Sequence, residues 1–324
     1  MNLIVSGKSR ALHRLNSHLL NSAVFKRDVG SKLGFNVLMN SEYQSINMVL
    51  LNKPHSSIHN LPDPQAVLHT RKVDYEAIEQ EYEQIVCVYK KFNIQVVQAS
   101  LGIVPQKDGG HLYNMQFARD QFFMTPKGAI MARMHSEIRR RETIFTEKAL
   151  KTHGILIKKR IQGRGTFEGA DALWVNKKLV IVGVGNRTNE DGFEQIREVL
   201  KEEGVECIGV EAPQSVLHLL GALQFVDKAL VLVRVELVAP EIMKILKDQY
   251  INIITVPESI EVIEKHAMNF VSIAPRSIIL PSRCAEMKKI CIDAGITIAA
   301  EVTVSQYCNA GGGLACATGV LSRG

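Results

Sequence analysis

Residues 173–210 read LWVNKKLVIVGVGNRTNEDGFEQIREVLKEEGVECIGV. Apolar and β-branched side chains dominate Leu173–Val184 and Val205–Val210, which is typical of strands. Between them, residues 190–203 form a charged stretch with interspersed apolar residues, and this predicts a helix. The sequence therefore predicts a strand, a helix and a second strand in succession.

The same order recurs along the chain, with helices predicted to begin near residues 75, 137, 190, 240 and 283. The first unit has a strand at Ser45–Leu51, a helix at Tyr75–Lys91 and a strand at Ile94–Val97. The other predicted helices are 137–151, Pro240–Lys247 and 283–294. The other predicted strands are 113–117, 121–124, Ala129–Arg133, 155–158, Ala229–Val235, Ile251–Val256, Ser277–Leu280 and Ile296–Val302.

These five α/β units leave two arrangements open. A unit of this size cannot bury its apolar face alone, so repeated units must pack on one another. A doubly wound sheet uses the same alternation, but a nucleotide-binding sheet needs a glycine-rich turn after its first strand. Asn52-Lys53-Pro54-His55 follows the first strand, and Gly183-Val184-Gly185 lacks the third glycine. We therefore expect no nucleotide cofactor.

Composition narrows the class of protein. The chain has 324 residues, of which 46% are hydrophobic and 22% charged, as in ordinary globular proteins. No apolar run reaches the ~18–20 residues of a membrane span, so no membrane partner is expected. None of the six cysteines forms a CxxC pair, and no Cys/His cluster has zinc-ligand spacing. We expect free thiols, no metal and a reducing compartment such as the cytoplasm.

The net charge of +6 is concentrated at the N-terminus, since residues 1–34 alone carry +5. The rest of the chain is nearly neutral, so no nucleic-acid partner is expected. The basic stretch 1–39 fits an organelle-targeting helix or a solvated extension, and both readings stay open. We expect residues 40–324 to form one domain. The oligomeric state is also open, a homo-oligomer included.

The C-terminal fourteen residues contain three successive glycines, 311–313, shortly before Cys316. Glycine tolerates positive φ and close approach of other groups, so this run predicts a loop that presents a thiol. A thiolate is a strong nucleophile when its pKa is lowered. The alternative is a tail that ends in a small buried cysteine.

Four further polar groups stand beside predicted strands. They are Arg119-Asp120, the Glu168–Asp171 segment, Arg187 in an Asn-Arg-Thr turn, and His218 in an apolar setting. Each has a structural explanation as a turn former, a surface charge or a core histidine.

Taken together with Cys316, these groups fit the chemistry of a guanidinium. Carboxylates are the natural partners of this flat cation, and Asp120 and Glu168 supply two of them. A thiolate can attack the central carbon to give a tetrahedral adduct. The departing amine needs a proton, for which His218 is suited, and the neutral imidazole can then deprotonate water.

In these motifs the chain resembles the guanidine-modifying, or pentein, superfamily of arginine deiminases, dimethylarginine dimethylaminohydrolases and amidinotransferases. The resemblance covers residues ~40–324 in order. Its marks are Phe117-Ala-Arg-Asp120, Glu168-Gly-Ala-Asp171, Asn186-Arg187-Thr188, His218-Leu219 and Gly311-Gly-Gly-Leu-Ala-Cys316-Ala-Thr318. It implies an α/β fold, a five-bladed propeller of ββαβ units around a central channel.

The resemblance also implies residue roles. Cys316 matches the nucleophile, His218 the general acid and base, and Glu168 the acidic residue beside the histidine. Asp120 matches the carboxylate that holds the guanidinium, while Arg187 and Arg139 match arginines that bind the substrate's α-carboxylate. The neighbours Arg119 and Asp171 complete the expected site, and Asp171 is expected to support the loop.

The implied substrate is a small guanidino compound, arginine or an N-methylated arginine, which gives a citrulline-type product and ammonia or an amine. In deiminases and amidinotransferases an aspartate stands two residues after the histidine, whereas here the residue is Leu220. This difference favours a dimethylaminohydrolase-like hydrolase. The alternatives are an amidinotransferase, in which an amine replaces water, and a pentein that only binds a partner.

Overall fold

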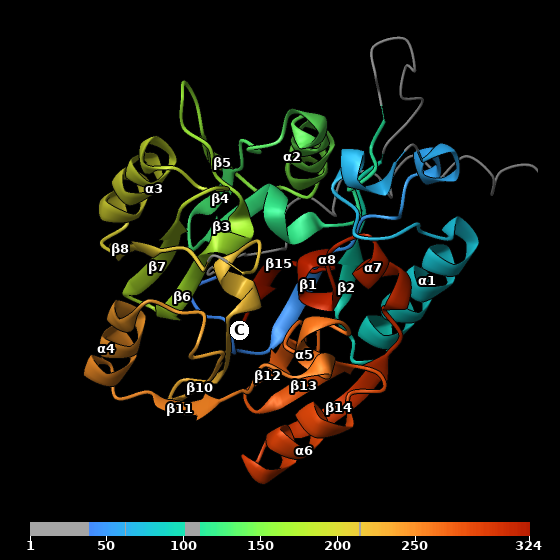
Figure 1. Ribbon diagram of the computed structural model, residues 1–324. Coiled ribbons are helices and arrows are strands. Elements are labelled where there is room, and N and C mark those ends of the chain that lie inside the picture. The colour runs from blue at the N-terminus through green and yellow to red at the C-terminus, as the bar shows by residue number, and fades with distance from the viewer. Residues whose placement is uncertain (1–38, 62, 101–110, 214) are drawn as a thin grey trace, which may run out of the picture. The chain divides into compact units, whose positions relative to one another are not determined.

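The computed structural model describes residues 39–61, 63–100, 111–213 and 215–324 (Figure 1). The described strands form five separate three-stranded sheets, in the orders β15-β1-β2, β3-β4-β5, β6-β7-β8, β9-β10-β11 and β12-β13-β14. The strands are β1 (Ile46–Leu50), β2 (Gln95–Val97), β3 (Phe122–Thr125), β4 (Gly128–Met131), β5 (Ile157–Arg160), β6 (Ala172–Asn176), β7 (Leu179–Val184), β8 (Glu206–Glu211), β9 (Leu223–Asp227), β10 (Leu230–Val233), β11 (Asn252–Thr255), β12 (Val271–Ala274), β13 (Ser277–Pro281), β14 (Thr297–Val302) and β15 (Gly319–Arg323).

Each sheet, called a blade below, is built in the same way. Its first two strands pair antiparallel, and a helix then crosses over to a third strand that pairs parallel with the second. The crossover helices are α1 (Tyr75–Lys91), α2 (Glu142–Thr152), α3 (Glu190–Glu202), α4 (Pro240–Asp248) and α6 (Ala285–Asp293). Because a parallel pair needs such a crossover, the alternation predicted from the sequence becomes five ββαβ units. The doubly wound alternative is wrong, since the named strands of the described residues form five separate sheets and an isolated bridge, Arg133 with Phe167, is the pairing between blades.

The first blade joins the two ends of the described chain. Its inner strand is β15, which pairs antiparallel with β1, so that Val320 lies opposite Val49. Figure 1 shows this red strand beside the blue β1 at the centre of the molecule. Arg323 of β15 donates to the carbonyl of Ser272 in β12, at 2.8 Å, and so links the first blade to the fifth. The last strand therefore connects the first blade to the fifth.

The core lies along the inner strands of the blades. Every residue of β3 and β15 is buried, as is every residue of β6 and β9 except the last. The indole of Trp174 in β6 stacks on Phe123 and donates to the carbonyl of Met124, at 3.1 Å, so neighbouring blades are also hydrogen-bonded. Among the described helices, none has the length and hydropathy of a membrane span.

Several predicted elements differ from the structure. Residues 113–117 are a buried turn rather than a strand, because Phe117 bonds back to Asn114. The predicted strand Leu173–Val184 is a hairpin of two strands, and β9, β12 and β15 were not predicted. The predicted helix 137–151 is a short 3-10 helix followed by α2, because Arg139 turns inward to two carboxylates. The predicted leader 1–39 lies almost entirely outside the described residues, so its boundary stays a prediction.

Candidate active site

Five polar side chains occupy equivalent places in the five blades, each just before the inner strand. Asp120 lies in the 3-10 helix η4 (Ala118–Gln121) before β3, Glu168 precedes β6, and His218 precedes β9. Asn269 stands two residues before β12, and Cys316 lies in α8 (Leu314–Ala317) before β15. Because the inner strands of all five blades surround one centre, these loops converge there (Figure 1).

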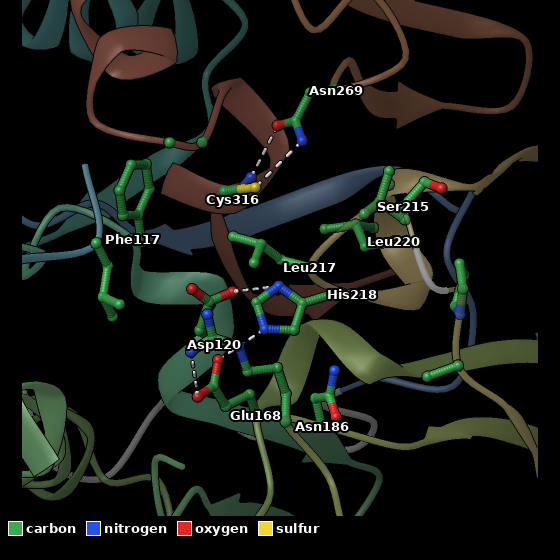
Figure 2. A pocket seen from close by; sticks show the side chains of 18 of the residues that line it. Phe117, Asp120, Glu168, Asn186, Ser215, Leu217, His218, Leu220, Asn269 and Cys316 are labelled. Atoms are coloured by element: carbon green, nitrogen blue, oxygen red, sulfur yellow. Dashed lines mark hydrogen bonds and ion pairs between the residues drawn. The ribbon is translucent and has the colours of Figure 1, made fainter. Parts of the chain in front are cut away.

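The five side chains line one cavity of about 1530 Å³. Figure 2 shows Cys316 and Asn269 on one side of it, with Asp120, His218 and Glu168 on the other. The remaining lining is both polar and apolar and includes His69, Asn114, Phe117, Arg187, Glu211, Leu217, Leu220, Arg234 and Ile263.

Asp120 is buried, and only one of its oxygens accepts a hydrogen bond from a described residue. Its Oδ2 accepts a hydrogen bond from Nη1 of Arg139 at 2.7 Å. Among the described residues its Oδ1 has no hydrogen-bond donor, and its contact with Nδ1 of His218 is an ion pair at 3.8 Å. A buried carboxylate oxygen without a donor is costly, so this atom calls for a ligand that carries N–H groups.

Arg139 lines the cavity and is held in place by two carboxylates. Besides Asp120, it pairs with Glu142, to which its Nε donates at 3.0 Å. Burial would lower the pKa of Arg139, but the charges of Glu142 and Asp120 raise it. Burial raises the pKa of Glu142 to about 7, although Arg139 opposes this. Arg139 therefore binds Asp120 directly. Its neighbour Arg140 pairs with the exposed Glu137.

Glu168 fixes the orientation of His218. Its Oε2 lies 2.7 Å from Nε2 of His218, while its Oε1 accepts from the backbone N–H of His135 at 3.2 Å. Arg187 approaches the same Oε1 at 3.6 Å, with 15% of its side chain exposed. Both oxygens of Glu168 are therefore engaged, and Nδ1 is the nitrogen of His218 that faces Asp120.

The carboxylates keep His218 protonated. Burial would lower the pKa of His218, but the charge of Asp120 and the hydrogen bond that His218 donates to Glu168 raise it to about 9. Burial would raise the pKa of Glu168, and the protonated His218 lowers it instead. At neutral pH the site therefore contains an imidazolium, the form of histidine that can give a proton to a leaving amine.

Cys316 is partly exposed and bonded to Asn269 by two contacts. Nδ2 of Asn269 donates to Sγ at 3.1 Å, and the backbone N–H of Cys316 donates to Oδ1 at 3.0 Å. Burial and the charge of Asp120 raise the pKa of the Cys316 thiol to about 11, while Asn269 acts to lower it. Without a ligand the resting form is thus a neutral thiol.

In the predicted loop of three glycines, each position requires glycine for a different physical reason. Gly311 has φ +88°, in the left-handed region, and a Cβ on Gly312 would lie 2.3 Å from the ring of Phe117. A Cβ on Gly313 would lie 2.8 Å from Oδ1 of Asn269. The chain after Cys316 is a buried strand, so the alternative of a flexible tail is wrong.

Two predicted site residues do not line the cavity. Arg119 is buried and donates to the carbonyl of Ala172 at 2.9 Å, with Glu42 at 3.4 Å. Asp171 accepts from Thr188 Oγ1 at 2.7 Å and from the backbone N–H of Leu219 at 3.1 Å. Asp171 therefore supports the loop beside His218, as expected, whereas Arg119 stabilises the contact between two blades. Leu220, in contrast, does line the cavity and is 5% exposed.

Asn269 and Glu142 were not anticipated. Asn269 lies in an apolar run, Ala267–Phe270, with no chemical signal of its own. Its signal is the repeat, since the site residues Asp120, Glu168, His218, Asn269 and Cys316 are 48, 50, 51 and 47 residues apart. Glu142 is one acid among several in a charged helix, and only the fold shows that it is fully buried.

Asp120, Glu168 and His218 also bring their ligand atoms within 4.8 Å of one another. Such a set can hold a metal ion, so the absence of a metal stays a prediction. The hydrogen bond between His218 and Glu168 already occupies two of the three ligands.

Several known proteins are similar to this chain in sequence. The sequence model of the arginine deiminase family matches residues 110–243. The N(G),N(G)-dimethylarginine dimethylaminohydrolase of Pseudomonas aeruginosa is 27% identical over 259 residues, which is 79% of this chain and 93% of that protein. The chain is thus similar to proteins of the guanidine-modifying (pentein) superfamily. An arginine deiminase of Listeria monocytogenes is 34% identical over 119 residues, 33% of this chain and 29% of that protein.

Solved structures of this superfamily show the same fold. The dimethylaminohydrolase of Pseudomonas aeruginosa, in complex with citrulline, superposes with a TM-score of 0.68 at 23% identity and covers 85% of this chain and 98% of its own. An amidinotransferase of Microseira wollei reaches 0.73 at 18% identity, with 89% and 97% covered. The predicted five-bladed α/β propeller is confirmed, and so is the predicted enzyme class, since the curated relatives are named as hydrolases of guanidino groups.

Proposed function

We propose that this guanidine-modifying protein hydrolyses arginine or an N-methylated arginine through a covalent adduct on Cys316. The observation that carries the proposal is Oδ1 of Asp120, a buried carboxylate oxygen without a donor on the wall of the cavity that Cys316 lines. A guanidinium supplies N–H donors and a positive charge together. We also propose that residues 40–324 form the catalytic domain.

The substrate cation itself activates the thiol in this proposal. The pKa of Cys316 is raised to about 11 by burial and by Asp120, so a thiolate forms only when positive charge arrives beside it. The guanidinium neutralises Asp120 and favours loss of the thiol proton to solvent. The sulfur electron pair then forms a bond to the guanidino carbon, and the C=N π electrons move onto nitrogen.

His218 transfers protons in both halves of the reaction. Its imidazolium gives the Nδ1 proton to the departing amine as the carbon–nitrogen bond breaks, leaving an amidino group on Cys316. The neutral imidazole then takes a proton from water as the water oxygen bonds to the carbon. In the collapse of the second adduct the carbon–sulfur bond breaks as the C=O bond forms, and the hydroxyl proton passes to solvent, which releases the thiolate and a citrulline-type product. In this scheme Glu168 is a positioning residue, because both its oxygens are engaged.

The resemblance implied that both Arg187 and Arg139 bind the α-carboxylate of the substrate, and we assign this role to Arg187 alone. We propose that Arg187, partly exposed on the cavity wall, binds the α-carboxylate of an amino-acid substrate. Arg139 is already paired with Asp120 and Glu142, so we assign to it the support of Asp120. Leu220 provides apolar room beside His218, which suits a methylated guanidino nitrogen.

The test is turnover by the wild-type chain and by Cys316→Ala. We expect release of ammonia or a methylamine, with citrulline, from arginine or a methylarginine, and loss of this activity in a variant that keeps the wild-type Tm. Cys308→Ala is the matched control, since Cys308 is a second partly exposed thiol outside the cavity lining. Full activity of Cys316→Ala would contradict the assignment.

The second candidate function is amidino transfer, and the size of the cavity favours testing it. A cavity of 1530 Å³ exceeds the volume of one arginine and leaves room for an acceptor amine. The two reactions share the adduct on Cys316 and differ in what attacks it. Equal rates of citrulline formation with and without glycine, lysine or ornithine support hydrolysis. A requirement for the amine, with a new guanidino product, supports transfer.

A further inference from the structure

The fifth blade contributes Asn269 at the position where the other blades contribute their site residues. It precedes the inner strand β12, as Asp120, Glu168 and His218 precede theirs. Its side chain is 7% exposed and lines the same cavity. The ring of five converging loops therefore holds two carboxylates, a histidine, a cysteine and this amide.

The orientation of the amide is fixed by its surroundings. The backbone N–H of Cys316 is a donor only, and it lies 3.0 Å from one atom of the amide, which must therefore be the oxygen. The other atom, 3.1 Å from Sγ, is then the NH₂ group. An amide NH₂ has no acceptor capacity, so sulfur receives a hydrogen bond and the proton of the thiol points elsewhere.

The contact is also rigid. The carbonyl of Asn269 accepts the backbone N–H of Ala315, at 3.1 Å, so backbone and side chain together grip the turn that carries Cys316. Gly313 lies against this amide, and a Cβ there would be 2.8–2.9 Å from three atoms of Asn269. The φ of Gly313 is −151°, which any residue can adopt, so the glycine is required for space and not for backbone conformation.

We propose that Asn269 is a further catalytic residue, which donates a hydrogen bond to Sγ of Cys316 and thereby stabilises the thiolate as nucleophile and as leaving group. The proposal rests on the proposed role of Cys316 as the nucleophile. A hydrogen bond to a charged acceptor is stronger than one to a neutral group, so this bond strengthens each time sulfur bears negative charge. Asn269 takes no proton in either step.

The test is the pH dependence of alkylation of Cys316 by iodoacetamide, followed by peptide mass spectrometry in the absence of substrate. Asn269→Asp keeps an oxygen for the backbone N–H of Cys316 but puts a carboxylate oxygen against sulfur. Asn269→Ala removes both bonds. Since a hydrogen bond to an ionised group stabilises it by about 1.5–3 kcal/mol, we expect each variant to raise the alkylation pKa of Cys316 by about 1–2. The alkylation rate at pH 7.5 should fall about 10- to 100-fold.

The control is Asn176→Asp. Asn176 makes the same two kinds of bond at a surface turn, since its Oδ1 accepts from the backbone of Lys178 and its Nδ2 donates to Gln249. In Asn176→Asp, Cys316 should be alkylated with the same pH dependence as in the wild type. Gly313→Ala tests the same contact without changing residue 269, and should also slow alkylation because the new methyl group displaces Asn269.

A purely structural role gives a different pattern. If Asn269 only caps the turn, then Asn269→Ala, in protein that keeps the wild-type Tm, keeps the wild-type alkylation profile, and that result overturns the proposal. Turnover distinguishes the role of Asn269 from the proposed function of the protein. We expect kcat to fall in Asn269→Asp, with KM for the guanidino substrate no higher than in the wild type. An unchanged alkylation pKa of Cys316 in the Asn269 variants would contradict the role of Asn269. Activity in the absence of Cys316 would contradict the proposed function.

Discussion

Nε2 of His218 lies 2.7 Å from Oε2 of Glu168, and both side chains are buried. This contact turns the other nitrogen of His218 toward Asp120 and holds the ring as an imidazolium. In the proposed mechanism a general acid is thus in place before the substrate arrives, while the proposed nucleophile is a thiol that still has to lose its proton.

Glu168→Gln should move the alkaline limb of the kcat profile to lower pH. The charge of Glu168 helps to raise the pKa of His218 to about 9, so its removal lowers that pKa and depletes the imidazolium as pH rises. With a decrease of one or more in the pKa, kcat at pH 9 should fall about ten-fold relative to kcat at pH 6.5. The measurement is kcat from pH 5.5 to 10 with saturating substrate.

Glu147→Gln is the control for this profile. Glu147 is also paired with arginine, at the surface with Arg160, and should leave the alkaline limb in place. An unchanged limb in Glu168→Gln itself would show that another group is the acid.

Arg187→Ala should raise KM for arginine by roughly 10- to 100-fold with less change in kcat. A charge-assisted contact with the α-carboxylate contributes about 1.5–3 kcal/mol, and uniform binding appears in KM. Agmatine, which lacks the carboxylate, should be used equally by variant and wild type. If the wild type uses agmatine and arginine with equal efficiency, then Arg187 does not bind the α-carboxylate of the substrate.

Leu220→Asp should shift preference from dimethylarginine toward arginine. The new carboxylate would accept hydrogen bonds from an unsubstituted guanidino nitrogen and would lose them with a methylated one. We expect the ratio of kcat/KM for dimethylarginine over arginine to fall at least ten-fold. Leu217→Ala, a change of an exposed residue at the same cavity, should alter both substrates alike. An unchanged ratio in Leu220→Asp would refute a specificity role for this position.

Chelation should leave activity unchanged. The ligand atoms of Asp120, Glu168 and His218 lie close enough for a metal ion, but the proposed chemistry uses them for a cation and a proton. We expect dialysis against EDTA to retain full turnover, and metal analysis of the active protein to find less than one ion per ten chains. Loss of activity that Zn²⁺ or Mn²⁺ restores would contradict this.

Local signals in the sequence were sufficient for the outer parts of the blades. The helix Tyr75–Lys91 was predicted with its observed bounds, because Asp74 caps it and its apolar residues recur at helical spacing. The inner strands β9, β12 and β15 were missed, because short buried strands next to turns have no periodicity that distinguishes them. β15 in particular depends on pairing with β1, which lies at the other end of the described chain.

The sequence alone identified the residues whose side chains are themselves reactive or charged. It did not show the contacts that form only when the fold brings two distant residues together. Cys316, His218 and Asp120 all line the cavity. The burial of Arg139 against Glu142, and the inward packing of Arg119 between blades, depend on backbone positions that charge alone does not show. Asn269 acquires its role only because it lies beside Cys316 in the folded chain.

The most direct test of the central claim is rapid acid quenching of the wild-type chain during turnover of arginine or a methylarginine, with mass spectrometry of the peptide that contains Cys316. The account predicts an amidino adduct on Cys316 that appears within the first turnover, disappears when substrate is exhausted and is absent in Cys316→Ala. Steady turnover with no adduct on this peptide at any time, together with full activity of Cys316→Ala, would contradict it.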